Sequence, residues 1–324
     1  MALRRALGWH RPLIAFAVCM GLLTLVCGVA WALDGRTLVG APVWAKPVKF
    51  SISLLVYAVT FAWMLERLPR HRRIGWWAGT VVAGAGMVEM VVIAAQAVRV
   101  RQSHFNVSTP LDSALFSLMG ATIAVLYVAT FVVAVLVLRS RLDDPVATWA
   151  VRLGILVALL GMSVGGLMLA PTPAQTLAAA TGAVTLVGAH SVGVPDGGPG
   201  LPLLGWSTTG GDLRVGHFVG MHALQLLPLL GLLLSRSRAR GWDVRARVRL
   251  VQLAGGVYAG VVVLTTWQAL RGQPLIDPDG ATVAATGALA LLALGASVLI
   301  ARTARPARSG PTPRERTSDV RHHP

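Results

Sequence analysis

Eight apolar runs, each long enough to cross a lipid bilayer, constrain the fold of this chain more than any other feature. They cover residues 13–33, 48–68, 74–98, 112–138, 152–170, 213–234, 250–270 and 282–301. A helix of about 20 apolar residues spans the hydrocarbon core of a membrane. With 55% hydrophobic and only 13% charged residues, the chain does not have the composition of a soluble domain. The sequence therefore predicts an all-α polytopic bundle of eight transmembrane helices over residues 1–302.

The charge distribution predicts how these helices are oriented. The chain carries 29 Lys and Arg residues and 13 Asp and Glu residues, for a net charge of +16. The excess falls on the N-terminus, on the connections after the second, fourth and sixth runs, and on the tail 303–324. Basic connections stay in the cytoplasm, so both termini are expected on the cytoplasmic face of a bacterial inner membrane. We expect this face to contact anionic lipids rather than nucleic acid, and the basic tail to be disordered.

The connection 171–212 is the longest polar interruption, and its predicted side is extracytoplasmic. Its segment 195–202 has the sequence PDGGPGLP. This is neither helix nor ordinary strand, because proline lacks an amide donor and glycine permits positive φ. The apolar residues 201–206 favour a cap that folds back over the outer ends of the helices. Asp212 is expected to cap the N-terminus of the next helix.

The helix after this loop carries two histidines, His217 and His222, and one amide, Gln225. The histidines are five residues apart, about 140° around a helix, so they cannot bind one ion as an i, i+4 pair would. His222 and Gln225 share one face. Polar groups are expensive inside a bilayer, so this helix is predicted to contribute to a functional site.

Other spans supply further polar groups. Glu89 is the only carboxylate predicted inside the hydrocarbon region, where an ionisable residue is a candidate for function. Lys46 and Lys49 are the only lysines in an arginine-rich chain, which favours a compact charge at this position. A rise of about 1.5 Å per residue brings Lys49 within reach of Glu89 and predicts an ion pair.

The same count of helical rise predicts one polar layer in the outer third of the membrane. Its predicted members are Lys49, Glu89, Gln96, Arg214, His217, His222, Gln225 and Gln268. Asp112 is left out of this layer, because Thr109, Pro110 and Asp112 form a capping box at the start of the fourth helix.

Three functions are compatible with this layer. In the first, His217 or His222, with His190, His104 or Glu89, ligates a metal or haem in a membrane redox or metal-handling protein. Haem, copper and iron are the candidate cofactors. In the second, Glu89, His222 and Lys49 form a proton relay in a transporter, although the two halves show no inverted repeat. In the third, the chain is an assembly or scaffold protein with a membrane-protein partner. A hydrolase or transferase would lack a G-x-S-x-G nucleophile motif.

Five segments carry a resemblance to a known group of proteins. They are WAKPVKF at 44–50, SHFN at 103–106, GAH at 188–190, PDGGPGLP at 195–202 and GDLR at 211–214. In these the chain resembles a family of uncharacterised eight-helix membrane proteins of high-GC actinobacteria, which implies the fold and no activity. The pattern His-x4-His-x5-Pro-Leu-Leu from His217 is also faintly similar to the His-x3-His helix of copper-dependent oxidase-assembly membrane proteins.

Overall fold

The computed structural model describes residues 8–182, 184–236 and 241–304, and it is almost entirely helical. Eight of its helices are long and apolar enough to span a membrane. They are α2 (Arg11–Leu33), α3 (Ala45–Glu66), α4 (Arg72–Val98), α5 (Pro110–Arg139), α6 (Pro145–Leu167), α8 (Leu213–Arg236), α9 (Val244–Leu270) and α10 (Gly280–Thr303). The prediction of an all-α, multi-pass membrane bundle is confirmed. Of the predicted tail 303–324, residues 305–324 lie outside the described residues.

Capping side chains determine where several of these helices begin. Thr109 accepts the amide of Asp112 at 3.1 Å before Pro110, as the capping box predicts. Asp144 caps α6 in the same way, with Pro145 as the first helical residue. The fifth span therefore starts at 145 rather than at the predicted 152, because the cap and the first turn precede the apolar run.

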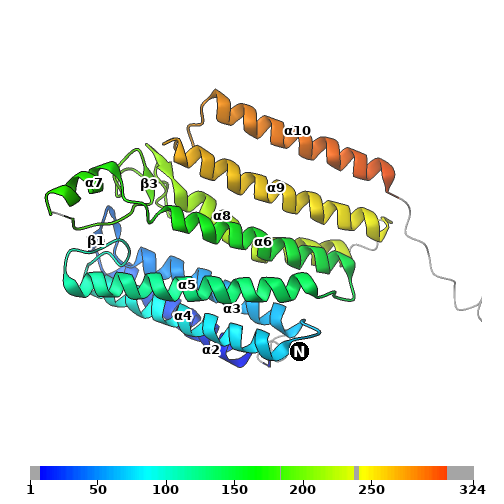
Figure 1. Cartoon of the computed structure of the whole chain (residues 1–324), viewed down its shortest axis with the longest axis horizontal. Coiled ribbons are helices and arrows are strands. Elements are labelled where there is room, and N and C mark those ends of the chain that lie inside the picture. The colour runs from blue at the N-terminus through cyan, green and yellow to red at the C-terminus, as the bar shows by residue number, and fades with distance from the viewer. Residues whose placement is uncertain (1–7, 183, 237–240, 305–324) are drawn as a thin grey trace, which may run out of the picture.

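The spanning helices form two lobes. The N-terminal lobe consists of α2, α3, α4 and α5, and the C-terminal lobe consists of α6, α8, α9 and α10 (Figure 1). The lobes meet where α5 packs on α6 and where α3 packs on α8. The first described helix begins and the last ends at the same end of the bundle (Figure 1), as an even number of spans requires.

The C-terminal lobe is built on a close crossing of α6 and α8. A Cβ added to Gly161 would lie 2.6 Å from the backbone of Gly220, and one added to Gly220 would lie 2.5 Å from Cα of Gly161. The two backbones therefore touch, as small residues allow in membrane helices. By contrast, α10 packs on α9 and buries few of its own side chains.

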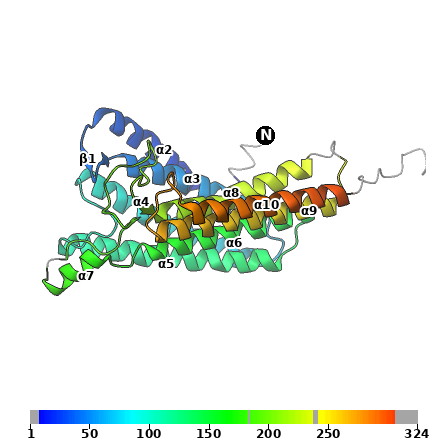
Figure 2. The ribbon, with the colours of Figure 1, turned by 90° about the horizontal axis from the view of Figure 1, so that it is seen from above.

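The short elements gather at the opposite end from the termini, which we call the outer end. They are β1 (Thr37–Leu38), β2 (Ala41–Pro42), α7 (Pro173–Ala180), β3 (Ser191–Val192) and β4 (Gly211–Asp212). Strand β1 pairs with β2 and β3 with β4, both antiparallel. Helix α7 projects beyond the spanning helices (Figure 2). The connection 171–212 is thus a folded segment across the outer ends.

Backbone hydrogen bonds tie this connection to the N-terminal lobe. The amide of Val187 donates to the carbonyl of Phe105, and the amide of Val107 donates to the carbonyl of Thr185. Phe105 has φ of 65°, an unusual conformation for a large side chain. The loop after α4 and the loop before α8 therefore form one layer that spans both lobes.

Candidate functional site

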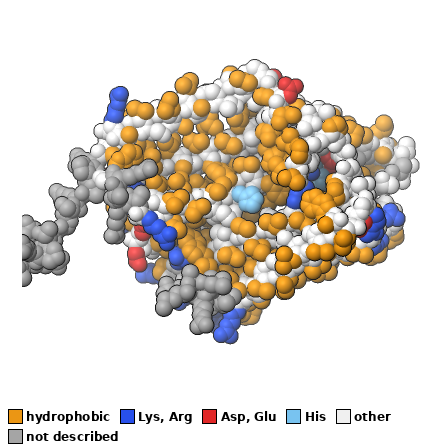
Figure 3. Space-filling view, turned by 180° about the vertical axis from the view of Figure 1, so that it is seen from behind, with side chains coloured by type: hydrophobic (Ala, Val, Ile, Leu, Met, Phe, Trp, Pro, Cys, Tyr) orange, Lys and Arg blue, Asp and Glu red, His pale blue; other side chains and the backbone are white. Residues whose placement is uncertain are grey.

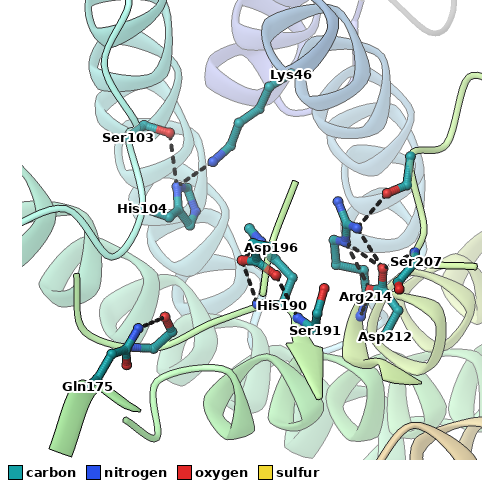
Figure 4. Close-up of polar contacts among 12 residues, drawn as sticks. Lys46, Ser103, His104, Gln175, His190, Ser191, Asp196, Ser207, Asp212 and Arg214 are labelled. Carbon is teal, nitrogen blue, oxygen red and sulfur yellow. Dashed lines mark hydrogen bonds and ion pairs between the residues drawn. The ribbon is translucent and has the colours of Figure 1, made fainter. Parts of the chain in front are cut away.

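Polar and ionisable side chains from both lobes converge under these outer loops (Figure 4). We call them the outer polar layer. Its members are Lys46, Lys49, His104, His190, Asp196, Asp212, Arg214 and His217, and they come from α3, α8, β4 and the loops at 99–109 and 181–212.

Lys46 and His104 contact each other in this layer. Nζ of Lys46 lies 3.0 Å from Nδ1 of His104, and Oγ of Ser103 lies 3.1 Å from the same nitrogen. Burial, followed by the positive charge of Lys46, holds the pKa of His104 well below its usual value. His104 is therefore neutral near pH 7, and its Nδ1 accepts a hydrogen bond from the Lys46 ammonium.

His190 is held by a carboxylate six residues later. Asp196 accepts from Nδ1 of His190 at 2.9 Å and from the backbone amides of His190 and Ser191 at 3.0 and 2.8 Å. Burial lowers the pKa of His190, and the hydrogen bond that His190 donates to Asp196 opposes this in part. Burial alone would raise the pKa of Asp196, but its bonds to His190 outweigh burial and lower it. The turn thus fixes the orientation of the His190 ring.

The start of α8 carries an ion pair that also binds the cap. Arg214 donates to Asp212 at 2.6 Å and to the carbonyl of Gly205 at 2.6 Å. Asp212 is almost fully buried, and it accepts the amide of Arg214 at 3.0 Å, so it caps the helix as predicted. Nζ of Lys49 donates to the carbonyl of Leu204 at 3.2 Å. The segment 204–207 therefore contacts cations of both lobes.

The two histidines of α8 face different neighbours. Nδ1 of His217 lies 2.8 Å from the carbonyl oxygen of Gly161 on α6. His222 lies 3.3 Å from Gln225 on its own helix. Their separation around α8 agrees with the prediction that they do not chelate one ion.

The predicted ion pair of Lys49 with Glu89 does not form. Glu89 is 3% exposed and accepts from Thr122 of α5 at 2.8 Å, while Lys49 points to the cap loop. Helical rise predicts depth along an axis but not rotation about it, so it could not predict that Lys49 points away from Glu89.

Two amides predicted for the layer have local partners instead. Gln96 donates to Asp112 at 2.9 Å, and Arg99 also bonds Asp112 at 2.9 Å. Gln268 donates to the carbonyl of Pro274 at 2.7 Å and so holds the connection between α9 and α10. Asp112 is predicted to act only as a cap, whereas it also pairs with Arg99 and accepts the amide of Gln96.

The predicted metal ligands are His104, His190, His217, His222 and Glu89. Within residues 8–182, 184–236 and 241–304, no three His, Cys, Asp or Glu side chains come together in a group that could hold a metal ion. His104, His190 and His217 each use Nδ1 in a hydrogen bond. Their Nε2 atoms bond to none of the described residues.

Two small cavities lie in the described part of the bundle. One of about 10 Å³ beside the layer is lined by residues that include Asp212 and Gln268. Another of about 10 Å³, at the opposite end of the bundle, is lined by residues that include Arg67 and Ser140. Each has room for about one water molecule.

Comparison of the chain with family models, with curated proteins and with solved structures finds no match.

Proposed function

We propose that this chain is a proton-coupled membrane transporter, with the outer polar layer as the site where it binds protons. The observation that carries the proposal is the 3.0 Å contact between Lys46 and His104. Two basic groups share one hydrogen bond beneath loops that join the two lobes. Ionisable groups within membrane proteins are typical of proton paths.

The chemistry of this contact supports coupling of proton uptake to movement. While Lys46 stays protonated, Nδ1 of His104 can bind a proton only after the ammonium has left it, since the two cations cannot present hydrogens to each other. Proton uptake would therefore release α3 from the loop 99–109. Loss of the proton to the other side would restore the contact.

The position of the layer supports the same function. Lys46 belongs to the N-terminal lobe, and Arg214 and His217 belong to the C-terminal lobe. Lys49 of α3 donates to the carbonyl of Leu204 and Arg214 of α8 donates to the carbonyl of Gly205, so one loop contacts both lobes. A change of protonation would thus be felt in both lobes, and transporters move such halves against each other.

Proton flux in vesicles tests this function. The purified protein is reconstituted around a pH-sensitive dye, and a potassium gradient with valinomycin makes the interior negative. We expect proton influx above that of protein-free vesicles, reduced to that background by His104→Gln. His71→Asn is the matched control, because His71 is an exposed histidine at the other end of the bundle. Wild-type flux equal to that of protein-free vesicles would contradict the proposal.

A metal or haem site is the second candidate, and one observation favours it. Nδ1 of His190 bonds a carboxylate and Nδ1 of His217 bonds a carbonyl oxygen, at 2.9 and 2.8 Å. Metal-bound histidines are commonly oriented in this way, with Nε2 as the ligand. Two such rings would hold copper, iron or haem with help from a further ligand.

An absorption spectrum with elemental analysis tests this second function. The detergent-purified protein is measured as isolated and after reduction with dithionite. A Soret band, or copper or iron near one equivalent, that is lost in both His190→Ala and His217→Ala would support it. A colourless protein that takes up no metal would contradict it, and His222→Ala serves as the control on the same helix.

A further inference from the structure

Lys46 and Lys49 stand in the first turns of α3 without a carboxylate partner. The ion pairs of the described chain join Arg36 to Asp34, Arg99 to Asp112, His190 to Asp196, Arg214 to Asp212 and Arg271 to Asp279. Neither lysine takes part. The hydrogen bonds of the two ammoniums go instead to a neutral histidine and to a backbone carbonyl.

The carboxylates nearest to the lysines are already engaged. Glu89 accepts from Thr122, Asp196 is bound by the His190 turn, and Asp212 is paired with Arg214. None of these acids lies within ion-pairing distance of either lysine among the described contacts. The lysines are three residues apart on one helix, and the charge of Arg214 acts on both. Positive charge near a helix N-terminus is also opposed by the helix dipole.

We propose that Lys46 and Lys49 bind the net-negative phosphate headgroup of a membrane lipid. When protonated, each lysine has three donors, and each uses one within the protein. Four donors therefore remain for phosphate oxygens, and lysine is a common phosphate ligand. The bound anion would supply the countercharge that the chain itself does not place there.

The surroundings of the lysines explain why the phosphate belongs to a lipid. Both side chains are partly exposed and lie on a membrane-spanning helix. Phe50 follows them and meets Phe218 of α8 edge to face, with ring centroids 6.3 Å apart. Further along α3, Ile52 is 47% exposed. The face of the molecule drawn in Figure 3 is mainly hydrophobic. An amphiphile fits such a surface, with its headgroup at the lysines and its chains along α3.

The lipid would be the ligand of the proposed transport site. Its binding does not depend on the proposed transport function, and only its movement across the membrane rests on that function. Binding is measured separately, as the shift in thermal unfolding of the detergent-purified full chain. The probes are dioctanoyl phosphatidylglycerol, dioctanoyl phosphatidylcholine and inorganic phosphate. We expect phosphatidylglycerol to stabilise the wild type most, since a ligand of the folded state raises its stability.

Matched variants locate the site. Lys49→Met is expected to weaken phosphatidylglycerol binding by about tenfold, as loss of a charged donor would. Lys49→Arg should retain binding, and so should Arg101→Gln, which removes an exposed basic residue of the same outer end. If inorganic phosphate stabilises as much as the lipid, the lipid source is overturned and the anion site stands. The proposal is overturned if phosphatidylglycerol and phosphatidylcholine shift the unfolding temperature equally. It is also overturned if phosphatidylglycerol stabilises the wild type and Lys49→Met equally. Lipid binding without proton flux would contradict transport alone.

Discussion

Nζ of Lys46 lies 3.0 Å from Nδ1 of His104, so each of these two bases depends on the protonation state of the other. Removing the lysine should therefore change the titration of the histidine. In Lys46→Met we expect the pKa of His104 to rise, because the charge of Lys46 is the second cause of its depression after burial. It should remain below about 6.5, since burial persists. NMR titration of labelled histidines measures this.

Lys49→Met is the control for that titration. Lys49 also lies at the start of α3, but its charge is not among those that depress the pKa of His104. Equal shifts in the two variants would show that His104 does not sense Lys46 directly.

Acid should destabilise the protein through the same histidine. The native pKa of His104 lies well below its usual value, whereas the unfolded chain binds a proton at about pH 6.5. As the pH falls through this value, the unfolded state gains a proton that the native state does not, and stability decreases. One such group removes roughly 1 kcal/mol at about pH 5.5.

The variant His104→Gln should lose less stability than the wild type between about pH 7.5 and 5.5. His190 remains, and its lowered pKa leaves part of the acid sensitivity. Thermal unfolding in detergent, followed by tryptophan fluorescence, measures the difference. Identical pH profiles for His104→Gln and wild type would refute this explanation.

The crossing of α6 and α8 should tolerate no side chain. A Cβ on Gly161 would lie 2.6 Å from the backbone of Gly220, so Gly161→Val is expected to destabilise by about 1–3 kcal/mol or more. Gly166 lies on the same helix with nothing within 4 Å of a built Cβ. Gly166→Ala should therefore leave the unfolding temperature close to that of wild type, and comparable losses in both variants would count against a specific crossing.

Glu89 should be coupled to Thr122 and not to Lys49. Thr122 donates to Glu89 at 2.8 Å, so Glu89→Met and Thr122→Val, each of which removes this bond, should show a coupling energy of about 0.5–3 kcal/mol in a double-mutant cycle. Lys49 instead donates to the carbonyl of Leu204 in the cap loop. Glu89→Gln with Lys49→Met should add within about 0.5 kcal/mol. Strong coupling in the second cycle would show that the two side chains meet.

The order and extent of the helices could be predicted because hydropathy and capping are local. Thr109, Pro110 and Asp112 lie within four consecutive residues, and they start α5 as expected. The contents of the polar layer could not be predicted so well. His104 and Lys46 are 58 residues apart, and only the rotation and neighbour order of α3 and α4 bring them together.

Some signals of the layer were nevertheless present in the sequence. The presence of both lysines of an arginine-rich chain at the start of α3 indicates a polar site there. Depth along the membrane does not predict that Lys46 contacts His104 or that Lys49 contacts the cap loop. Asp196 follows His190 by six residues in a glycine-rich turn, which is a reach that a local loop can close. Gln96 and Gln268 are predicted to belong to the layer, but they bond nearby groups instead. Buried amides commonly satisfy backbone carbonyls and carboxylates close to them, which the sequence does not distinguish from a functional site.

The contact between Gly161 and Gly220 also limits where a hinge between rigid parts of the molecule can lie. Helices in backbone contact cannot slide without separating. We therefore expect α6 and α8 to move as one rigid body, together with His217 and Arg214 of α8. Across the other boundary, α3 meets α8 through the edge of Phe50 against Phe218, a contact without interlocking backbones. A movement between the lobes would therefore keep α6 and α8 together and would take place where α3 meets α8 and α5 meets α6, the first of which lies beside the two lysines.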